Sequence, residues 1–390
     1  METVKTVVQN YRPEPRLLDL MEQFRQMINL SIAIGLETGI TSLKSLSKAG
    51  YHRLKVFDTR SKYRLCAISR AAGILKNYRN LSKKHRVKVP YCRRAGLTTC
   101  YGLKIRNNEL ILPGGFHILL NNHTLSLLDV PSHRIRSATL TGSRICVSFS
   151  KEKRLIDPKG MLGIDRNLNN ATAADSHGNI LVHDLSKVVI VKSASRRTIA
   201  RFKRDDVRIR QRIAAKYGRI QRNRTQWLLH NATKKLVEHA RKYDLGVALE
   251  NIKGIRRLYR RGNGQSTYYR GRMNSWPFYE VGRQVSYKAS WDGLPTVDVN
   301  PKGTTSKCSV CGDRMVFSKE SRMLHCPSCS YQVDRDVNAA RNILSAGLRF
   351  SLLGLSNEAM KGNPSTTVIP GVDDSQSSLP VEAHLEQPKT

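Results

Sequence analysis

Two amphipathic helices are predicted in the N-terminal part of the chain, because apolar side chains recur there every three or four positions. The first pattern runs from Arg16 to about Leu36, and the second from Tyr63 to Tyr78. Such a period places the apolar residues on one face of a helix. Lysines and arginines occupy the remaining surface of the second helix, which is either an ordinary solvated face or a face that binds a phosphate backbone.

Short apolar or alternating runs replace the helical period between Val87 and about Phe149. Pro-Gly-Gly, Asn-Asn-His and Thr-Gly-Ser sequences separate these runs. Alternation with a period of two indicates half-buried strands, and Gly, Pro and Asn mark the turns between them. This part of the chain therefore predicts a small β barrel or sandwich.

A third pattern begins after Gly160 and reads strand, strand, strand, helix. The strands are predicted at 161–164, 171–174 and 180–182, with a hairpin turn at 175–179. A long basic helical region follows at about 193–243, then a strand at 245–249, a loop rich in Arg, Gly and Tyr, a helix near 276–291 and a strand near 296–299. An antiparallel hairpin sheet extended by strands that alternate with helices favours an α/β fold with an RNase H-like core. The tail after about Asn357 is rich in Ser, Pro, Gly and Thr and is predicted to be disordered.

The charge balance indicates a polyanionic partner. The chain has 67 Lys and Arg against 30 Asp and Glu, a net charge of +37, and such an excess repels itself unless a polyanion neutralises it. A membrane surface and an unspecialised basic protein are the alternatives, but the charge is spread over long mixed segments instead of one short polybasic tail. Nucleic acid is the expected partner.

The eight cysteines are expected to be reduced. The first residues contain no apolar signal core and no apolar stretch is long enough to span a bilayer, so we expect an intracellular protein without a disulfide framework. Four cysteines are scattered along the chain and are expected to be small core residues, namely Cys66, Cys92, Cys100 and Cys146.

The remaining cysteines form two Cys-x-x-Cys knuckles, namely Cys308 with Cys311 and Cys326 with Cys329. Two thiolates at this spacing face one ion while backbone amides donate to the sulfurs, and two knuckles complete a tetrahedral site. A redox dithiol and an iron–sulfur cluster are the alternatives. Because no protein ligand is missing, we expect one structural zinc ion. Gly312 follows the first knuckle where the turn needs a residue free of Cβ strain, and Ser330 takes the equivalent place after the second.

Three acids stand where an apolar strand ends or a helix begins. Asp165 follows the run 161–164, Glu250 follows 247–249, and Asp336 lies in 334–344, shortly after Cys329. A carboxylate at the end of an apolar strand is costly unless it binds a positive partner, and three such oxygen ligands suit a pair of Mg2+ ions for phosphodiester hydrolysis. Each acid also has a plain structural interpretation, as a turn residue, a salt-bridge partner and a helix N-cap, respectively.

These motifs resemble a known family. Gly163-Ile164-Asp165, Leu249-Glu250-Asn251-Ile252, the ribbon at 305–312 and the segment 334–340 resemble, in order and spacing, the RuvC-like domain of TnpB proteins. TnpB proteins are the transposon-encoded, OrfB-type relatives of type V CRISPR effectors. The resemblance is specific over about 159–347 and only architectural over 1–158. It departs from the family pattern at Ser330, where glycine is usual, and at the Arg166-Asn167 pair after the first aspartate.

The resemblance implies a RuvC-like, RNase H-like nuclease core with an inserted four-cysteine zinc ribbon, and an N-terminal β-barrel wedge domain with a helical insert. The implied boundaries are a wedge strand at 1–12, a helical recognition insert at 13–86, a β-rich wedge domain at 87–158, the core at 159–302, the ribbon at 303–333, the end of the core at 334–350 and a disordered tail at 351–390.

The resemblance also implies RNA-guided, Mg2+-dependent cleavage of double-stranded DNA by a two-metal mechanism. The guide RNA would come from the transposon end, and the protein would be cytoplasmic and nucleoid-associated in a prokaryotic cell. Asp165, Glu250 and Asp336 would be the catalytic, Mg2+-binding acids, with Asn338 in a supporting role. Asp336 is preferred over Asp334 because it holds the Asp-x-Asn position of the motif. A nuclease-inactive guided DNA-binding protein or repressor, and an accessory transposase, are the alternatives; no strand-transfer nucleophile is evident in the sequence.

A segment rich in arginine and tyrosine follows Glu250. Guanidinium groups bind phosphates and aromatic rings stack on unpaired bases, so this segment is predicted to guide a single strand, unless it is only a solvated basic loop. The predicted contact residues are Arg256, Arg257, Arg260, Arg261, Arg270, Arg272, Tyr268 and Tyr269. The long basic helix is expected to follow a duplex backbone without reading its sequence, through Arg201, Lys203, Arg204, Arg208, Arg210 and Arg212.

Overall fold

The computed structural model describes residues 2–152, 154–202, 207–317 and 322–352. These residues divide into two compact units, with the division between Glu152 and residue 153. Of the tail predicted to be disordered from residue 351 onward, Ser351 and Leu352 belong to the last helix, Arg335–Leu352, and 353–390 lie outside the described residues.

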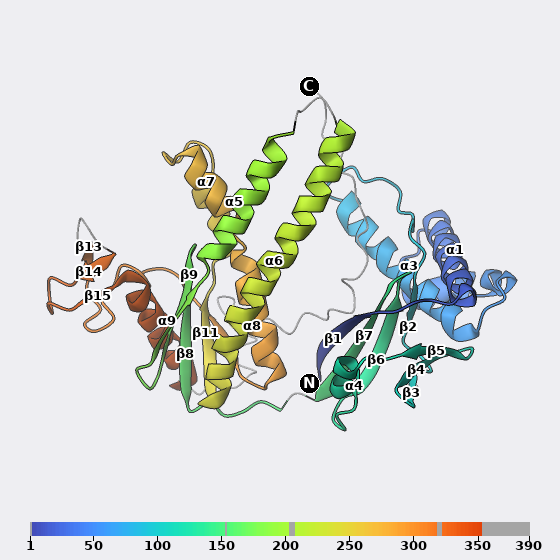
Figure 1. Ribbon diagram of the computed structural model, residues 1–390, viewed down its shortest axis with the longest axis horizontal. Helices are drawn as coiled ribbons and strands as arrows, with labels where there is room; N and C mark the ends of the chain where they lie inside the picture. Colours follow the sequence, from blue (N-terminus) through green and yellow to red (C-terminus); the bar gives the residue numbers. More distant parts are fainter. Residues whose placement is uncertain (1, 153, 203–206, 318–321, 353–390) are drawn as a thin grey trace. The chain divides into compact units, whose positions relative to one another are not determined.

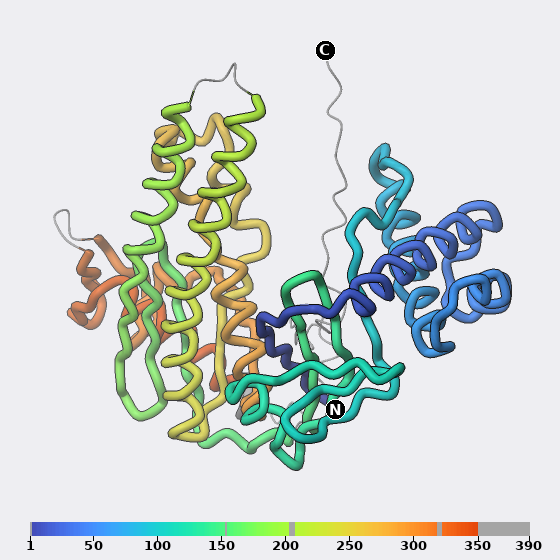
Figure 2. The backbone as a smooth tube through the Cα atoms, turned by 45° about the vertical axis from the view of Figure 1, so that its right-hand side comes forward, coloured from blue at the N-terminus to red at the C-terminus, as the bar shows by residue number. Residues whose placement is uncertain are grey.

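The first unit begins with strand β1 (Glu2–Asn10) and then forms a group of helices, α1 (Pro15–Thr38), α2 (Leu43–Gly50), η1 (His52–Val56) and α3 (Ser61–Ser82). α1 and α3 lie side by side (Figures 1 and 2). α1 buries the predicted apolar stripe, which includes Phe24 and Met27. A proline at the start of α1 and Gly39, in the left-handed conformation at its end, explain where that helix begins and ends. Both predicted helices are confirmed.

The β-rich part of the first unit contains two sheets. One has the order β1-β7-β6-β2 and the other the order β3-β4-β5. Their strands are β2 (Leu97–Thr99), β3 (Lys104–Arg106), β4 (Glu109–Leu112), β5 (Phe116–Leu119), β6 (Arg134–Leu140) and β7 (Arg144–Glu152). The Asn-Asn-His sequence, predicted to be a turn, instead begins helix α4 (Asn122–Leu128), because the Asn121 side chain accepts a hydrogen bond of 2.8 Å from the backbone N–H of Thr124.

The four scattered cysteines are predicted to be core residues, but only one of them is buried. Cys66 on α3 is buried, Cys92 and Cys146 are half-buried, and Cys100 is exposed. The prediction is wrong for Cys100 because the residue lies just past the end of β2, where the chain turns back to the surface.

The second unit is built on a five-stranded sheet with the order β10-β9-β8-β11-β12. Its strands are β8 (Gly160–Arg166), β9 (Asn170–Asp175), β10 (Ile180–Asp184), β11 (Leu245–Glu250) and β12 (Thr296–Val299). β8, β9 and β10 are antiparallel neighbours, whereas β11 runs parallel to both β8 and β12. The predicted hairpin and its extension by parallel strands are therefore present.

Helices cover both faces of this sheet (Figure 1). On one face, Leu162 and Ile164 of β8 pack in a core with α6 (Val207–Lys242) and α8 (Phe278–Trp291), and this core includes the buried Trp276. On the other face, Met161 and Ala248 pack against α9 (Arg335–Leu352). Successive side chains of a strand point to opposite faces, so β8 and β11 each present alternate residues to α9.

Two predicted segments differ in detail from the structure. The long basic helical region is not one helix: α5 (Ser186–Ala200) ends and α6 begins at Val207, with 203–206 outside the described residues. The segment predicted as a loop contains η2 (Ile255–Tyr259) and α7 (Thr267–Ser275). α7 forms because the Ser266 hydroxyl caps its first turn by accepting from the N–H of Tyr269 at 3.2 Å. Within the described residues, no helix is both long and apolar enough to cross a membrane.

Candidate functional site

Asp165 and Glu250 end two neighbouring parallel strands at the same edge of the sheet. Ile164 of β8 pairs with Leu249 of β11, so the next residue of each strand is the acid. Two positions before each acid lies a residue that packs toward α9: Gly163 before Asp165 in β8, and Ala248 before Glu250 in β11. Because side chains alternate along a strand, both carboxylates lie on the face that α9 covers.

α9 approaches this face closely because Gly163 has no side chain. A Cβ atom built on Gly163 would lie 2.3 Å from the backbone nitrogen of Leu344 and 2.5 Å from the backbone oxygen of Ala340. The close packing places the helix along β8, with Asp336 one turn before Ala340. The glycine of the Gly-Ile-Asp motif therefore lets the third acid reach the strand that carries the first.

Asp334 and Asp336 have different surroundings. Asp334 Oδ1 accepts from the backbone N–H of Asp336 at 2.8 Å and of Val337 at 3.3 Å, which is how an N-cap residue acts. Its side chain is 39% exposed, whereas that of Asp336 is 3% exposed. The helix-cap interpretation thus applies to Asp334 and leaves Asp336 facing the sheet.

Amide, hydroxyl and guanidinium groups hold the three acids. Asn167 Nδ2 donates to Asp165 Oδ2 at 2.7 Å, and Thr304 Oγ1 donates to Glu250 Oε1 at 2.5 Å. Asp336 Oδ2 accepts from Asn170 Nδ2 at 3.0 Å and is also paired with the Arg322 guanidinium. In addition, Arg166 donates to the backbone oxygen of Glu250 and so fixes the end of β11. Of these partners, only Arg166 and Asn167 stand out in the sequence, as a departure from the family pattern; the one signal for Asn170 is its place in the polar segment that follows the Gly-Ile-Asp motif.

The acids repel one another at this edge. Burial raises the pKa of Asp165, and the carboxylates of Glu250 and Asp336 raise it further, to about 7, although the hydrogen bond from Asn167 works in the opposite direction. The three acids are thus coupled electrostatically, in a site that favours a positive partner.

Two observations bear on whether this edge fits a divalent cation. Asp336 Oδ1 is buried and has no hydrogen-bond partner within the described part of the chain, and an unpaired buried acceptor costs free energy unless it binds something. Carboxylate and neutral oxygens are also the ligands that Mg2+ prefers. The chemistry of the donors therefore suits Mg2+, although within the described ranges only the four thiols of the ribbon form a group close enough to share one ion directly.

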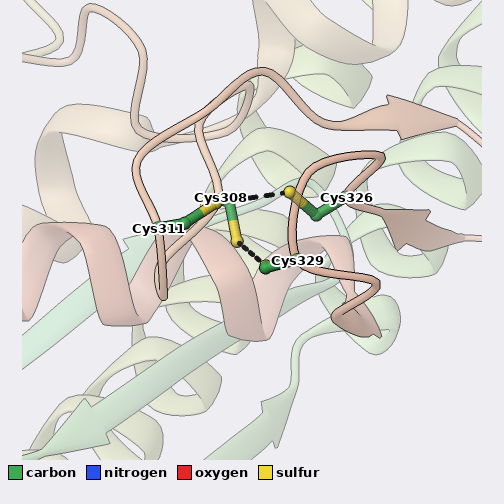
Figure 3. Close-up of side chains that lie close together, drawn as sticks. All are labelled: Cys308, Cys311, Cys326 and Cys329. Carbon is green, nitrogen blue, oxygen red and sulfur yellow. Dashed lines mark hydrogen bonds between the residues drawn. The ribbon is translucent and has the colours of Figure 1, made fainter.

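The four thiols converge between two turns of the ribbon. Their sulfur atoms all lie within 4.8 Å of one another, with 3.6 Å between Cys308 and Cys329 and 3.4 Å between Cys311 and Cys326. Figure 3 shows the four side chains pointing toward one another. Zinc–sulfur bonds of about 2.3 Å in a tetrahedron place sulfurs about 3.8 Å apart, so the cluster has nearly the size that a zinc ion requires.

The turns after the two knuckles have the geometry predicted from the sequence. Gly312 has φ +86° and Ser330 has φ +57°, both in the left-handed region. In each turn this residue donates its backbone N–H to the carbonyl of the first cysteine of its knuckle, at 3.0 and 2.9 Å. A short sheet, β13 (Val316–Phe317), β14 (Met323–His325) and β15 (Gln332–Asp334), continues the ribbon into α9.

Asn338 joins the ribbon to α9. The side chain is fully buried; its Nδ2 donates to the carbonyl of Lys307 at 2.8 Å, and its Oδ1 accepts from the N–H of Ser309 at 3.0 Å. The Asn338 amide thus forms hydrogen bonds with the backbone on both sides of Cys308. Asn342, one turn further along α9, donates to the same Lys307 carbonyl at 2.8 Å. The helix that carries Asp336 is therefore fastened to the first cysteine knuckle.

Some of the residues predicted to contact nucleic acid are exposed to solvent, and others are held by neighbouring residues. Arg256, Arg257, Arg260 and Arg261 are exposed, as are Tyr268 and Tyr269. Arg270 donates within its own helix turn, to Thr267 Oγ1 at 3.1 Å, and the Arg272 guanidinium lies 5.7 Å from the centre of the Tyr268 ring. Of the basic helical residues, Lys203 and Arg204 lie outside the described ranges. Trp227, which is not among the predicted contacts, is 66% exposed on α6.

The fold and site define a mixed α/β protein with an inserted four-cysteine cluster, and comparisons with known proteins agree. Residues 278–343 match the family model described as the TNB domain of Cas12f1-like proteins. The chain is 29% identical to the TnpB-like protein MJ0751 of Methanocaldococcus jannaschii over 202 residues, which cover 49% of this chain and 71% of that protein. It is 36% identical to the putative RNA-guided DNA endonuclease InsQ of Escherichia coli over 91 residues, 22% of this chain and 21% of that one.

A solved structure has a similar fold. The Cas12f1 chain in a cryo-EM structure of the Cas12f1–sgRNA–target DNA complex superposes with a TM-score of 0.61 at 15% identity, covering 85% of this chain and 83% of that chain. Together these similarities support a TnpB-type protein.

Proposed function

We propose that the chain is an RNA-guided DNA endonuclease that cuts phosphodiester bonds with two Mg2+ ions. The observation that carries the proposal is the meeting of Asp165, Glu250 and Asp336 at one edge of the sheet, where burial, and then the charges of Glu250 and Asp336, raise the pKa of Asp165 to about 7. The sheet order, an antiparallel hairpin followed by two parallel strands, supports an RNase H-like, RuvC-type core. The division of the chain near residue 152 supports a separate N-terminal wedge domain with its helical insert.

Asp165, Glu250 and Asp336 would hold the two cations. When bound, Mg2+ would activate the attacking water and stabilise the leaving oxygen. The chain's own part is to orient the carboxylates, through Asn167 on Asp165 and Thr304 on Glu250, and to fix the end of β11 through Arg166. Carboxylates held in this way are preorganised for ligand binding, because their rotamers are fixed before the ion arrives.

Guide RNA and double-stranded DNA are the proposed partners. The net charge of +37 and the exposed arginines 256, 257, 260 and 261, which directly follow the candidate site, support binding of a nucleic-acid backbone. Exposed Tyr268 and Tyr269 are suited to stacking on unpaired bases. The relative named as a putative RNA-guided DNA endonuclease, and the Cas12f1 chain solved with sgRNA and target DNA, support the same class of partner.

We assign the ribbon a structural role. One zinc ion on the four cysteines would hold the knuckle that Asn338 ties to α9, two residues after Asp336. The ribbon would then place the third acid, and direct contact with DNA would be secondary.

Cleavage and RNA content test the proposal together. Purified protein should carry one RNA species and cut matching DNA only with Mg2+, and Asp165→Ala should bind the same DNA without cutting it. Glu238→Ala removes an exposed acid of the same unit, on α6, and should cut normally. Equal cutting by Asp165→Ala would overturn the site, random RNA fragments would overturn guidance, and binding by wild type without cleavage in Mg2+ or Mn2+ would favour a guided DNA-binding protein.

A further inference from the structure

Asn170 combines two unusual features at the candidate site. Its Nδ2 donates to Asp336 Oδ2, yet its own Oδ1 is buried and has no partner within the described residues. Asn170 begins β9, where Ala171 and Ala173 pack in the core on the α6 side. By strand alternation, Asn170 and Thr172 therefore face α9, as Asp165 does.

Three buried side-chain oxygens near this edge of the sheet have no hydrogen-bond partner in the described part of the chain. Besides Asn170 Oδ1 they are Asp336 Oδ1 and Thr172 Oγ1, and Thr172 lies directly across the ladder from Asp165. Each unpaired acceptor costs about 1–3 kcal/mol, so three in one place require a common explanation. A hard cation is such an explanation, because it takes several oxygen ligands at once.

We propose that Asn170 is a fourth member of the cation site: its amide nitrogen fixes the Asp336 carboxylate, and its amide oxygen is a neutral ligand for a divalent cation. The proposal rests on the function proposed above for the three acids. A planar amide carries its oxygen beside its nitrogen, so the group that holds Asp336 Oδ2 also places an oxygen next to that carboxylate. A neutral ligand suits the position because a fourth carboxylate would add to the repulsion among the acids.

The same sheet offers a matched control. Asn179 lies in the turn between β9 and β10, and its Nδ2 donates to Asp175 Oδ2 at 2.9 Å, as Asn170 Nδ2 does to Asp336. Asp175 pairs with Leu162, three positions along β8 from Asp165, or about 10 Å away. Replacing Asn179 thus breaks an equivalent hydrogen bond to a buried aspartate without reaching the proposed site.

The test measures the binding of Mn2+ to the full, zinc-loaded chain after a high-salt wash has removed nucleic acid. Bound Mn2+ is followed by the loss of the electron paramagnetic resonance signal of free Mn2+. Thermal unfolding without added divalent cation is recorded in parallel. We expect Asn170→Ala to weaken Mn2+ binding tenfold or more, the order found when supporting groups of metal sites are removed, about 10- to 100-fold. Asn170→Asp keeps an oxygen and should bind at least ten times more tightly than Asn170→Ala. Asn179→Ala should lose thermal stability and bind Mn2+ like wild type.

Unchanged Mn2+ affinity in Asn170→Ala would overturn the inference. Equal losses of Mn2+ affinity in Asn170→Ala and Asn170→Asp would also overturn it, because the lost hydrogen bond to Asp336 would then explain both results without an oxygen ligand. Failure of the function proposed above gives a different result from failure of this inference. In that case the wild type would show no Mn2+ binding that is lost in Asp165→Ala.

Discussion

Replacing Asp165 by asparagine should stabilise the cation-free protein at neutral and alkaline pH. The pKa of Asp165 is raised from 3.8 to about 7, by burial first and then by Glu250 and Asp336. The folded state therefore holds a proton that the unfolded chain releases, and stability falls as the pH rises from about 4 to about 7. Above pH 7 the full cost is about 4 kcal/mol, from about 1.4 kcal/mol per pKa unit. Asparagine has the shape of the protonated acid without its titration, so it removes up to that amount.

Thermal unfolding of zinc-loaded protein in Mg2+-free buffer, between pH 5 and pH 8, measures this effect. A gain of about 4 kcal/mol corresponds to about 8–16 °C in Tm for a unit of this size, and the gain should shrink as the pH falls toward 5. Mg2+ should raise the Tm of the wild type at pH 8 more than that of Asp165→Asn. Asp175→Asn is the control on the same hairpin: burial alone would raise the pKa of Asp175, but hydrogen bonds from Asn179 and His239 outweigh it and lower the pKa, so this variant should lose stability. An Asp165→Asn variant that is no more stable than wild type at pH 8, or a gain independent of pH, would refute the reasoning.

Three further predictions follow from the packing of the second unit. Ser330→Gly should stabilise the ribbon by about 1 kcal/mol, because φ +57° strains a residue with a Cβ; thermal unfolding and the rate of zinc release to a chelator measure this, and a less stable variant would contradict it. Gly163→Ala should lower the free energy of unfolding by about 3 kcal/mol or more, because its Cβ would meet the α9 backbone at 2.3 Å. Gly218→Ala is the control: it has open space around it on α6 and should raise the free energy of unfolding by up to about 1 kcal/mol. Equal Tm values for the two variants would be inconsistent with the close packing. Asn338→Ala should lose about 1–2 kcal/mol, because it removes the partner of the Ser309 N–H and of the Thr305 carbonyl, while the Lys307 carbonyl keeps Asn342. The variant should also release zinc faster than wild type, and cut DNA more slowly than wild type while binding DNA equally well; normal zinc retention would show that the amide does not fasten the knuckle.

The sequence by itself determined the elements and the candidate acids, because both depend on local patterns. The apolar period of α1 and α3, the hairpin of β9 and β10, and the two cysteine knuckles are each encoded within a short stretch of chain. Even the strained turn at Ser330 was predictable, since the spacing after a knuckle demands a positive φ. The start of α7 was less accessible, because it depends on which of several polar residues acts as the cap, here Ser266.

Only the tertiary structure decided how the acids are held. Which aspartate caps α9 and which faces the sheet depends on how closely the helix approaches Gly163. The partners Asn170, Thr304 and Arg322 come from the start of β9, a loop and the ribbon, and no period or spacing connects them with an acid far away in the chain. A carboxylate's charge state and ligands depend on its burial and on its neighbours in space, and these exist only once the sheet and α9 have packed together.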